Sequence, residues 1–73
     1  MNLPTDLSGD NLRRALERIG FFFQRQKGSH MILRRAEPRA RVVVPAHRRI
    51  RPGTLRQILH AAGLSVEDLK ELL

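Results

Sequence analysis

Two short turns constrain this chain most, because they separate three runs of strand-forming residues. The runs span residues 21–26, 30–35 and 41–44, and each contains aromatic, branched or other apolar side chains. The turn at residues 27–29 contains glycine, and the turn at residues 36–39 contains proline. Parallel neighbours in a sheet need a crossover of about a dozen residues or more, so connections this short join antiparallel strands. The sequence therefore predicts a three-stranded antiparallel meander.

An amphipathic helix is predicted over residues 9–20, before the first strand. Ser8 is a suitable N-cap, and Gly20 is suited to the left-handed conformation that ends many helices. Apolar side chains recur at i, i+3, i+4 and i+7, namely at Leu12, Ala15, Leu16 and Ile19. This spacing predicts one apolar face that must be buried.

A second helix follows the strands, and a short third helix follows the second. Thr54 and Gln57 fit a capping box, so the second helix is expected to begin at Thr54 and to end at Gly63. Ser65 is expected to open the third helix, which carries Val66, Leu69 and Leu72. The second helix has its own apolar stripe, formed by Leu55, Ile58, Leu59 and Ala62.

Both longer helices need a surface to cover, and only one sheet is available. The economical solution is an α+β fold of order α-β-β-β-α, with the helices on one face of the sheet and a short extra helix at the C-terminus. Residues 1–73 are expected to form one domain, with residues 1–7 as a flexible N-terminal segment. Alternation along the second strand directs Met31 and Leu33 to the helices and His30, Ile32 and Arg34 to the opposite face. Phe21 and Phe23 are expected in the core and Phe22 at the surface.

The composition excludes several classes of protein. There are no cysteines among the 73 residues, which excludes disulfides and thiolate zinc sites and suits a cytoplasmic protein. No apolar run approaches the roughly 20 residues of a transmembrane helix, so no membrane association is expected. A metal site built from three widely spaced histidines is disfavoured, and no cofactor is expected.

The charge distribution favours anionic partners. Fourteen Lys and Arg oppose seven Asp and Glu, which gives a net charge of +7. Between Gln24 and Gln57 the only acid is Glu37, against ten Lys and Arg. Such a basic middle is suited to nucleic acid or to an acidic protein, although a charged face is often only solvated.

Several segments together resemble one family. The main segment is Arg25-Gln26-Lys27-Gly28-Ser29-His30, preceded by Gly20-Phe21. Leu7-Ser8-Gly9, Val44-Pro45-Ala46-His47, Pro52-Gly53-Thr54-Leu55, Ile58-Leu59 and Ala62-Gly63-Leu64 continue the match in order. From Ser8 to the C-terminus the chain resembles the HicA toxins, which are mRNA interferases of type II toxin–antitoxin systems. The turn at residues 36–39 and the basic loop at residues 48–51 depart from the family pattern.

The resemblance implies a double-stranded-RNA-binding-domain-like fold and an endoribonuclease activity on mRNA with His30 as the catalytic residue. It also implies a HicB-like antitoxin partner. Because the basic face would attract an acidic partner and inhibition requires His30 to be blocked, the antitoxin is expected to cover the active site. The chemistry agrees, since RNA carries its own nucleophile, the 2′-hydroxyl, and histidine ordinarily titrates near working pH. Gly28 would let the backbone approach a phosphate, and Ser29 would bond phosphate or only close the turn. The other candidate RNA-binding residues are Arg25, Lys27, Arg34, His47, Arg48, Arg49 and Arg51.

Two alternatives remain open from the sequence. The chain could be a non-catalytic RNA-binding module, because a fold alone does not establish an activity. It could also be a partner of an acidic protein with no RNA chemistry. His47 is either a loop residue or an RNA contact, and His60 is expected to be an ordinary surface residue near a helix end. No second proton-transfer group is evident beside His30.

Overall fold

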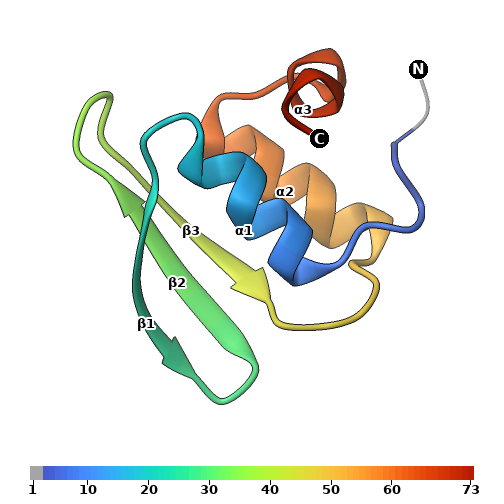
Figure 1. Cartoon of the computed structure of the whole chain (residues 1–73), viewed down its shortest axis with the longest axis horizontal. Coiled ribbons are helices and arrows are strands. Elements are labelled where there is room, and N and C mark those ends of the chain that lie inside the picture. Colours follow the sequence, from blue (N-terminus) through green and yellow to red (C-terminus); the bar gives the residue numbers. More distant parts are fainter. Residues whose placement is uncertain (1–2) are drawn as a thin grey trace.

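The computed structural model describes residues 3–73 and contains one antiparallel sheet covered on one face by helices (Figure 1). The elements follow the order α1 (Gly9–Glu17), β1 (Phe22–Lys27), β2 (His30–Arg35), β3 (Ala40–Pro45), α2 (Pro52–Ala62) and α3 (Val66–Leu72). The sheet order is β1-β2-β3, and both neighbouring pairs are antiparallel. The predicted α+β fold, with its double-stranded-RNA-binding-domain-like order of elements, is confirmed.

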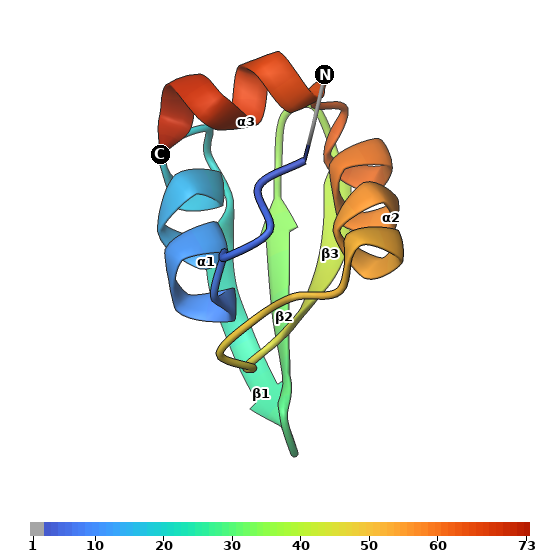
Figure 2. The same ribbon diagram turned by 90° about the vertical axis from the view of Figure 1, so that its right-hand side faces the viewer.

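The helices lie together on the same side of the sheet (Figure 2). The α1 helix contacts β1, β3 and α3, and the α2 helix contacts β3. The α3 helix is the predicted C-terminal addition, and it begins with its own capping box at Ser65 and Asp68. The Ser65 backbone N–H donates to the Asp68 carboxylate at 3.0 Å, and this bond lowers the pKa of Asp68.

The two predicted glycine helix ends are both present. Gly20 and Gly63 have positive φ angles of 97° and 75°. The Gly20 and Phe21 N–H groups donate to the carbonyls of Glu17 and Leu16, which is the paired bonding of a Schellman motif. Regular α-helix nevertheless ends at Glu17 rather than at Gly20, because residues 18–20 form the closing turn.

The predicted start of the second helix is wrong. Helix α2 begins at Pro52, with Arg51 as an N-cap whose side chain makes no capping bond, so Thr54 is not the N-cap. Proline has a φ angle already suited to the first helical turn and lacks the N–H that would be left without a partner there. The expected apolar face of this helix is buried as predicted.

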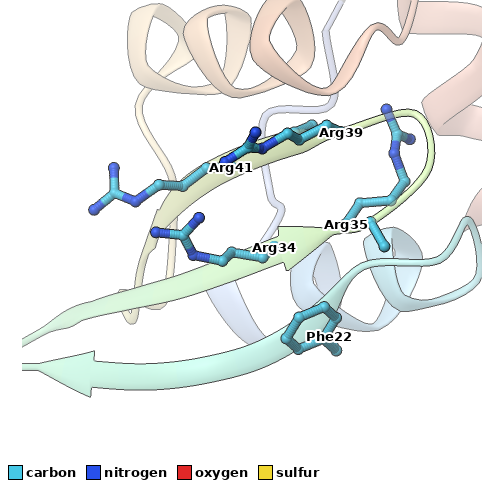
Figure 3. Close-up of a pocket in the computed structure, with 7 residues that line it drawn as sticks. Phe22, Arg34, Arg35, Arg39 and Arg41 are labelled. Carbon is cyan, nitrogen blue, oxygen red and sulfur yellow. The ribbon is translucent and has the colours of Figure 1, made fainter.

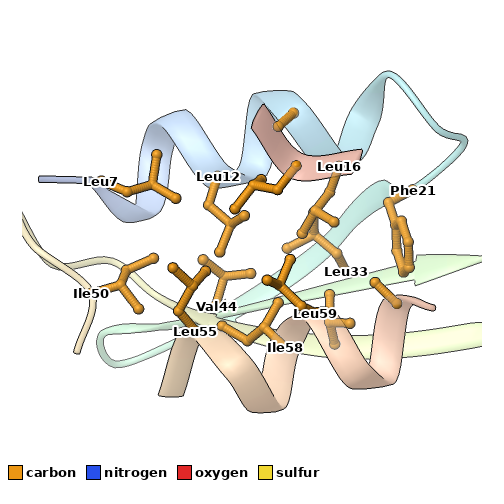
Figure 4. Packing of buried hydrophobic residues seen from close by; sticks show 14 of the residues in the cluster. Leu7, Leu12, Leu16, Phe21, Leu33, Val44, Ile50, Leu55, Ile58 and Leu59 are labelled. Atoms are coloured by element: carbon orange, nitrogen blue, oxygen red, sulfur yellow. The ribbon is translucent and has the colours of Figure 1, made fainter. Parts of the chain in front are cut away.

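The core lies between the sheet and the helices and also includes part of the N-terminal segment (Figure 4). Leu3 is 9% exposed and Leu7 is 4% exposed, so both leucines belong to the core. The Leu7 carbonyl also accepts a hydrogen bond from the Ile50 N–H at 2.9 Å. A small domain has limited apolar surface to bury, and these leucines extend it. Residues 1–2 lie outside the described part of the chain.

One aromatic residue lies elsewhere than predicted. Phe21 is in the core, but Phe23 is 39% exposed. Phe23 pairs with Leu33, so it does face the helix side, yet β1 is an edge strand. The Arg13 guanidinium lies over the Phe23 ring, 5.5 Å from its centroid. The register of β1 shifts between Phe23 and Arg25, which leaves Gln24 as the extra residue of a bulge.

Candidate functional site

The sheet face away from the helices, here called the open face, carries most of the candidate residues. Met31 and Leu33 are buried on the helix side, and His30 and Arg34 alternate to the open face, as predicted. Strand pairing arranges the open-face side chains in three rows across the sheet. The rows are Lys27–His30–Pro45, Arg25–Ile32–Val43 and Phe22–Arg34–Arg41.

The turn between β1 and β2 positions His30. Gly28 has a φ angle of 59°, whereas no residue other than glycine has a positive φ angle in the described chain. Glycine with a positive φ angle at the first position of a two-residue loop is typical of a type II′ hairpin turn, whose twist matches that of the strands. Lys27 and His30 consequently form the last cross-strand pair of the ladder. A Cβ atom on Gly28 would meet nothing within 4 Å, so the backbone conformation is what requires glycine here.

One hydrogen bond joins this turn to the loop that follows β3, and another lies within the hairpin. The Ser29 carbonyl accepts from the Ala46 N–H at 2.6 Å. The Gly28 carbonyl accepts from the Gln26 side chain at 3.0 Å. The His30 side chain is exposed, as are Gly28 and Ser29. His30 therefore lies next to a turn that is stabilised by hydrogen bonds, and its exposed side chain is accessible to a large ligand.

The basic loop at residues 46–51 is anchored at both ends. The Gly9 N–H donates to the His47 carbonyl at 2.9 Å, and the buried Ile50 contributes to the core. The side chains of Arg48, Arg49 and Arg51 are exposed, and Arg49 lies 3.5 Å from the Asp6 carboxylate. The structure brings the start of this loop beside the Ser29 turn, whereas Arg34 lies four residues along β2 from His30, about 13 Å away.

Within the described residues 3–73, the open-face cations have no carboxylate partners. The salt bridges among residues 3–73 join Arg13 to Glu17 and Arg49 to Asp6, and neither pair involves Arg25 or Lys27. Over the same described span, no group of three or more His, Cys, Asp or Glu side chains is placed to hold a metal ion. No helix in that span is long and apolar enough to cross a membrane. The site at His30 therefore offers one imidazole for proton transfer, with the positive charges of Lys27 and Arg25 nearby and no carboxylate paired with them in the described chain.

Residues 9–64 match the family model described as the HicA toxin of bacterial toxin-antitoxin. The chain belongs to the HicA toxin family. The match covers α1, all three strands, α2 and its glycine cap, whereas α3 lies beyond it. No match was found among curated proteins. This HicA-family chain is therefore the toxin of a toxin–antitoxin system, and an antitoxin is its partner.

Two open-face features of this HicA-family toxin were not predicted from its sequence. Gln24 accepts a hydrogen bond from the Arg34 Nε at 2.8 Å and so orients that guanidinium. Arg41 is the cross-strand partner of Arg34. The bulge places Gln24 beside Arg34, and neither composition nor periodicity indicates where a bulge falls. The Arg41 pairing follows from register, which depends on the turn between β2 and β3.

Proposed function

We propose that this toxin is a metal-independent endoribonuclease that cleaves mRNA and uses His30 to activate the RNA 2′-hydroxyl. The observation that carries the proposal is the position of His30. It is exposed beside a glycine turn and is the cross-strand partner of Lys27. The open face around it holds several cations that form no salt bridge in the described chain. The neutral imidazole takes the proton of the 2′-hydroxyl, and the 2′ oxygen attacks the adjacent phosphorus. The bond to the 5′ oxygen breaks, and that oxygen leaves with a proton from the imidazolium or from water.

The neighbours of His30 supply charge stabilisation. Lys27 in the same row and Arg25 in the next row can both reach a phosphate bound over the turn, where negative charge builds up in the transition state. Arginine binds phosphate oxygens with two parallel donors, whereas lysine acts as a compact point charge. The absence of a side chain at Gly28 lets RNA approach the backbone, and the Ser29 hydroxyl is a further donor.

The reaction itself is the first test. Incubation with single-stranded RNA in excess EDTA should give fragments with 2′,3′-cyclic phosphate and 5′-hydroxyl ends, because the 2′ oxygen is the nucleophile and no metal takes part. A 2′-deoxynucleotide at the cleaved position should abolish cutting there while binding persists. Loss of all cleavage in EDTA, or cutting at the deoxy position, would contradict this mechanism. RNA that is bound but never cut would favour the RNA-binding module instead.

The loop arginines Arg48, Arg49 and Arg51 are proposed to hold phosphate next to the active turn. Replacing all three with Ala should lower RNA affinity and flatten its salt dependence, by about 0.7 in the log–log slope for each lost phosphate contact on a single strand. A matched control instead removes three exposed cations from α1, its closing turn and α2, at Arg14, Arg18 and Arg56. Equal slopes for the two variants would show that the loop makes no specific contact with RNA.

The antitoxin partner is proposed to be a HicB-like protein that covers His30. An acidic surface would be steered to the open face, where Arg25, Lys27 and Arg34 lie, and association would be fast and salt-sensitive. In the cleavage assay above, stoichiometric antitoxin should stop cutting, and the complex should bury His30. A complex that leaves His30 exposed and contacts only the helices would contradict this mode of inhibition.

A further inference from the structure

A shallow hollow lies at the end of the open face away from His30 (Figure 3). Its volume of about 330 Å³ falls at the lower end of the range for small-molecule sites. It is lined by Phe22, Arg34, Arg35, Ala36, Arg39, Ala40 and Arg41. Its lining thus combines one aromatic ring with four arginines and contains no acidic side chain.

Two of these arginines form a like-charged pair. Arg34 and Arg41 are direct cross-strand partners, and like charges in that position are destabilising. No salt bridge in the described chain involves either of them, so the repulsion is not relieved within the protein. The bond from Arg34 Nε to Gln24 fixes the guanidinium and leaves its terminal NH₂ groups for a ligand. An anion between the two guanidinium groups would convert the repulsion into a favourable contact.

Arg35 lines the same hollow but is already engaged on the other side of the sheet. Its guanidinium donates to the carbonyls of Pro38 at 2.7 Å and Ala62 at 3.3 Å, and it stacks over the Phe21 ring at 4.6 Å. Figure 3 shows its guanidinium turned away from those of Arg34 and Arg41. The cations free to meet a ligand in the hollow are therefore Arg34, Arg41 and Arg39.

Phe22 completes the row that contains this pair. It is the cross-strand partner of Arg34, and its side chain is 51% exposed. An exposed aromatic face beside guanidinium groups is the arrangement that proteins use to stack a nucleobase while holding its backbone. An acidic peptide would use the charges but would leave the ring face without a flat partner.

We propose that Phe22, Arg34 and Arg41 form a nucleotide subsite for single-stranded RNA, remote from the scissile phosphate. A nucleobase stacks on Phe22, and an adjacent phosphate lies between Arg34 and Arg41, with Arg39 at the margin. The subsite rests on the proposed function in that RNA is the ligand. Because the row lies about 13 Å along β2 from His30, RNA that reaches both must cross the middle row of Arg25, Ile32 and Val43.

The test measures binding without cleavage. Short all-deoxy oligonucleotides lack the 2′-hydroxyl and cannot be cut, and 2-aminopurine placed at successive positions reports stacking by loss of fluorescence. For the wild-type protein, one position should be strongly quenched. Phe22→Ala should abolish that quenching and weaken binding about 5- to 150-fold, the equivalent of 1–3 kcal/mol for one stacked base. Phe22→Trp should keep both, because it keeps an aromatic face.

Phe23→Ala is the matched control, since Phe23 is the neighbouring exposed phenylalanine on the opposite side of the sheet. It should bind the oligonucleotides like the wild type, and thermal unfolding should show that all variants fold. Unchanged binding by Phe22→Ala, or equal loss in Phe23→Ala, would overturn the subsite. Loss of antitoxin binding alone in Phe22→Ala would also overturn it and assign the hollow to protein recognition. If Phe22→Ala weakens oligonucleotide binding but the wild-type protein never cuts RNA, only the proposed catalysis is refuted. If the wild type cuts RNA but Phe22→Ala binds oligonucleotides as tightly as the wild type, only the subsite is refuted.

Discussion

His30→Ala should lose RNA cleavage and toxicity while keeping the fold. Removing a general acid–base group typically slows a reaction about 100- to 10,000-fold, and no other titratable side chain shares the row with Lys27 and His30. The side chain is exposed and makes no hydrogen bond in the described chain, so its loss should leave the melting temperature nearly unchanged. Cleavage rates on a defined RNA, measured beside circular dichroism melts, report both effects.

His60→Ala provides the control for this variant. His60 is an exposed histidine in the last turn of α2, on the helix side of the sheet, and the proposed mechanism gives it no role. It should cut RNA at the wild-type rate and remain toxic. A His30→Ala protein that is as fast as His60→Ala would refute the assignment of His30. A His30→Ala protein that still binds RNA but does not cut it separates catalysis from binding.

Gly9→Ala should destabilise the fold severely. A Cβ atom on Gly9 would lie 2.0 Å from the Pro45 carbonyl oxygen and 3.2 Å from the Ala46 Cα. Both are backbone atoms, so they cannot move aside as a flexible side chain would, and α1 would have to shift off the end of β3. Overpacking typically costs about 1–3 kcal/mol, and this clash should reach or exceed that range. Urea or thermal unfolding measures the loss.

The Gly9 N–H bond to the His47 carbonyl links this contact to the active end of the sheet. Gly9→Ala should therefore also disturb the loop that begins beside Ser29 and lower cleavage in any protein that still folds. Gly53→Ala is the matched control, because Gly53 also lies in a first helical turn but has open space around it. Replacing Gly53 with Ala should leave the free energy of unfolding unchanged or raise it by about 0.4–1 kcal/mol. Equal stability of the two variants would show that α1 does not depend on this close approach.

The elements governed by local chemistry were predicted well. The strand at residues 30–35 has the predicted bounds, and both glycine helix ends are present with their paired hydrogen bonds. The division of β2 into a helix side and an open face was also correct, because strand side chains alternate regardless of context. The placement of an exposed His30 next to the Gly28 turn follows from the same alternation and from the turn chemistry.

Two predictions were wrong, one on the start of a helix and one on the burial of an aromatic side chain. Thr54 and Gln57 have the residue types of a capping box, but helix α2 begins at Pro52, two residues before Thr54. Leu3 and Leu7 carry no helical or strand periodicity, and only the structure shows that they join the core. Phe23 has the parity of a core residue, but the edge strand on which it lies is only partly covered.

The sequence by itself determined the antiparallel meander, the helix ends and the basic open face with His30 on it, because short turns, glycine caps and side-chain alternation act within a few residues. Only the tertiary structure decided the rest. It aligned Phe22, Arg34 and Arg41 in one row, set Gly9 against Pro45 and joined the Ser29 turn to Ala46. These relations depend on strand register, on one bulge and on helix docking. Register and docking are set by how the whole core packs, and local sequence patterns do not encode that packing.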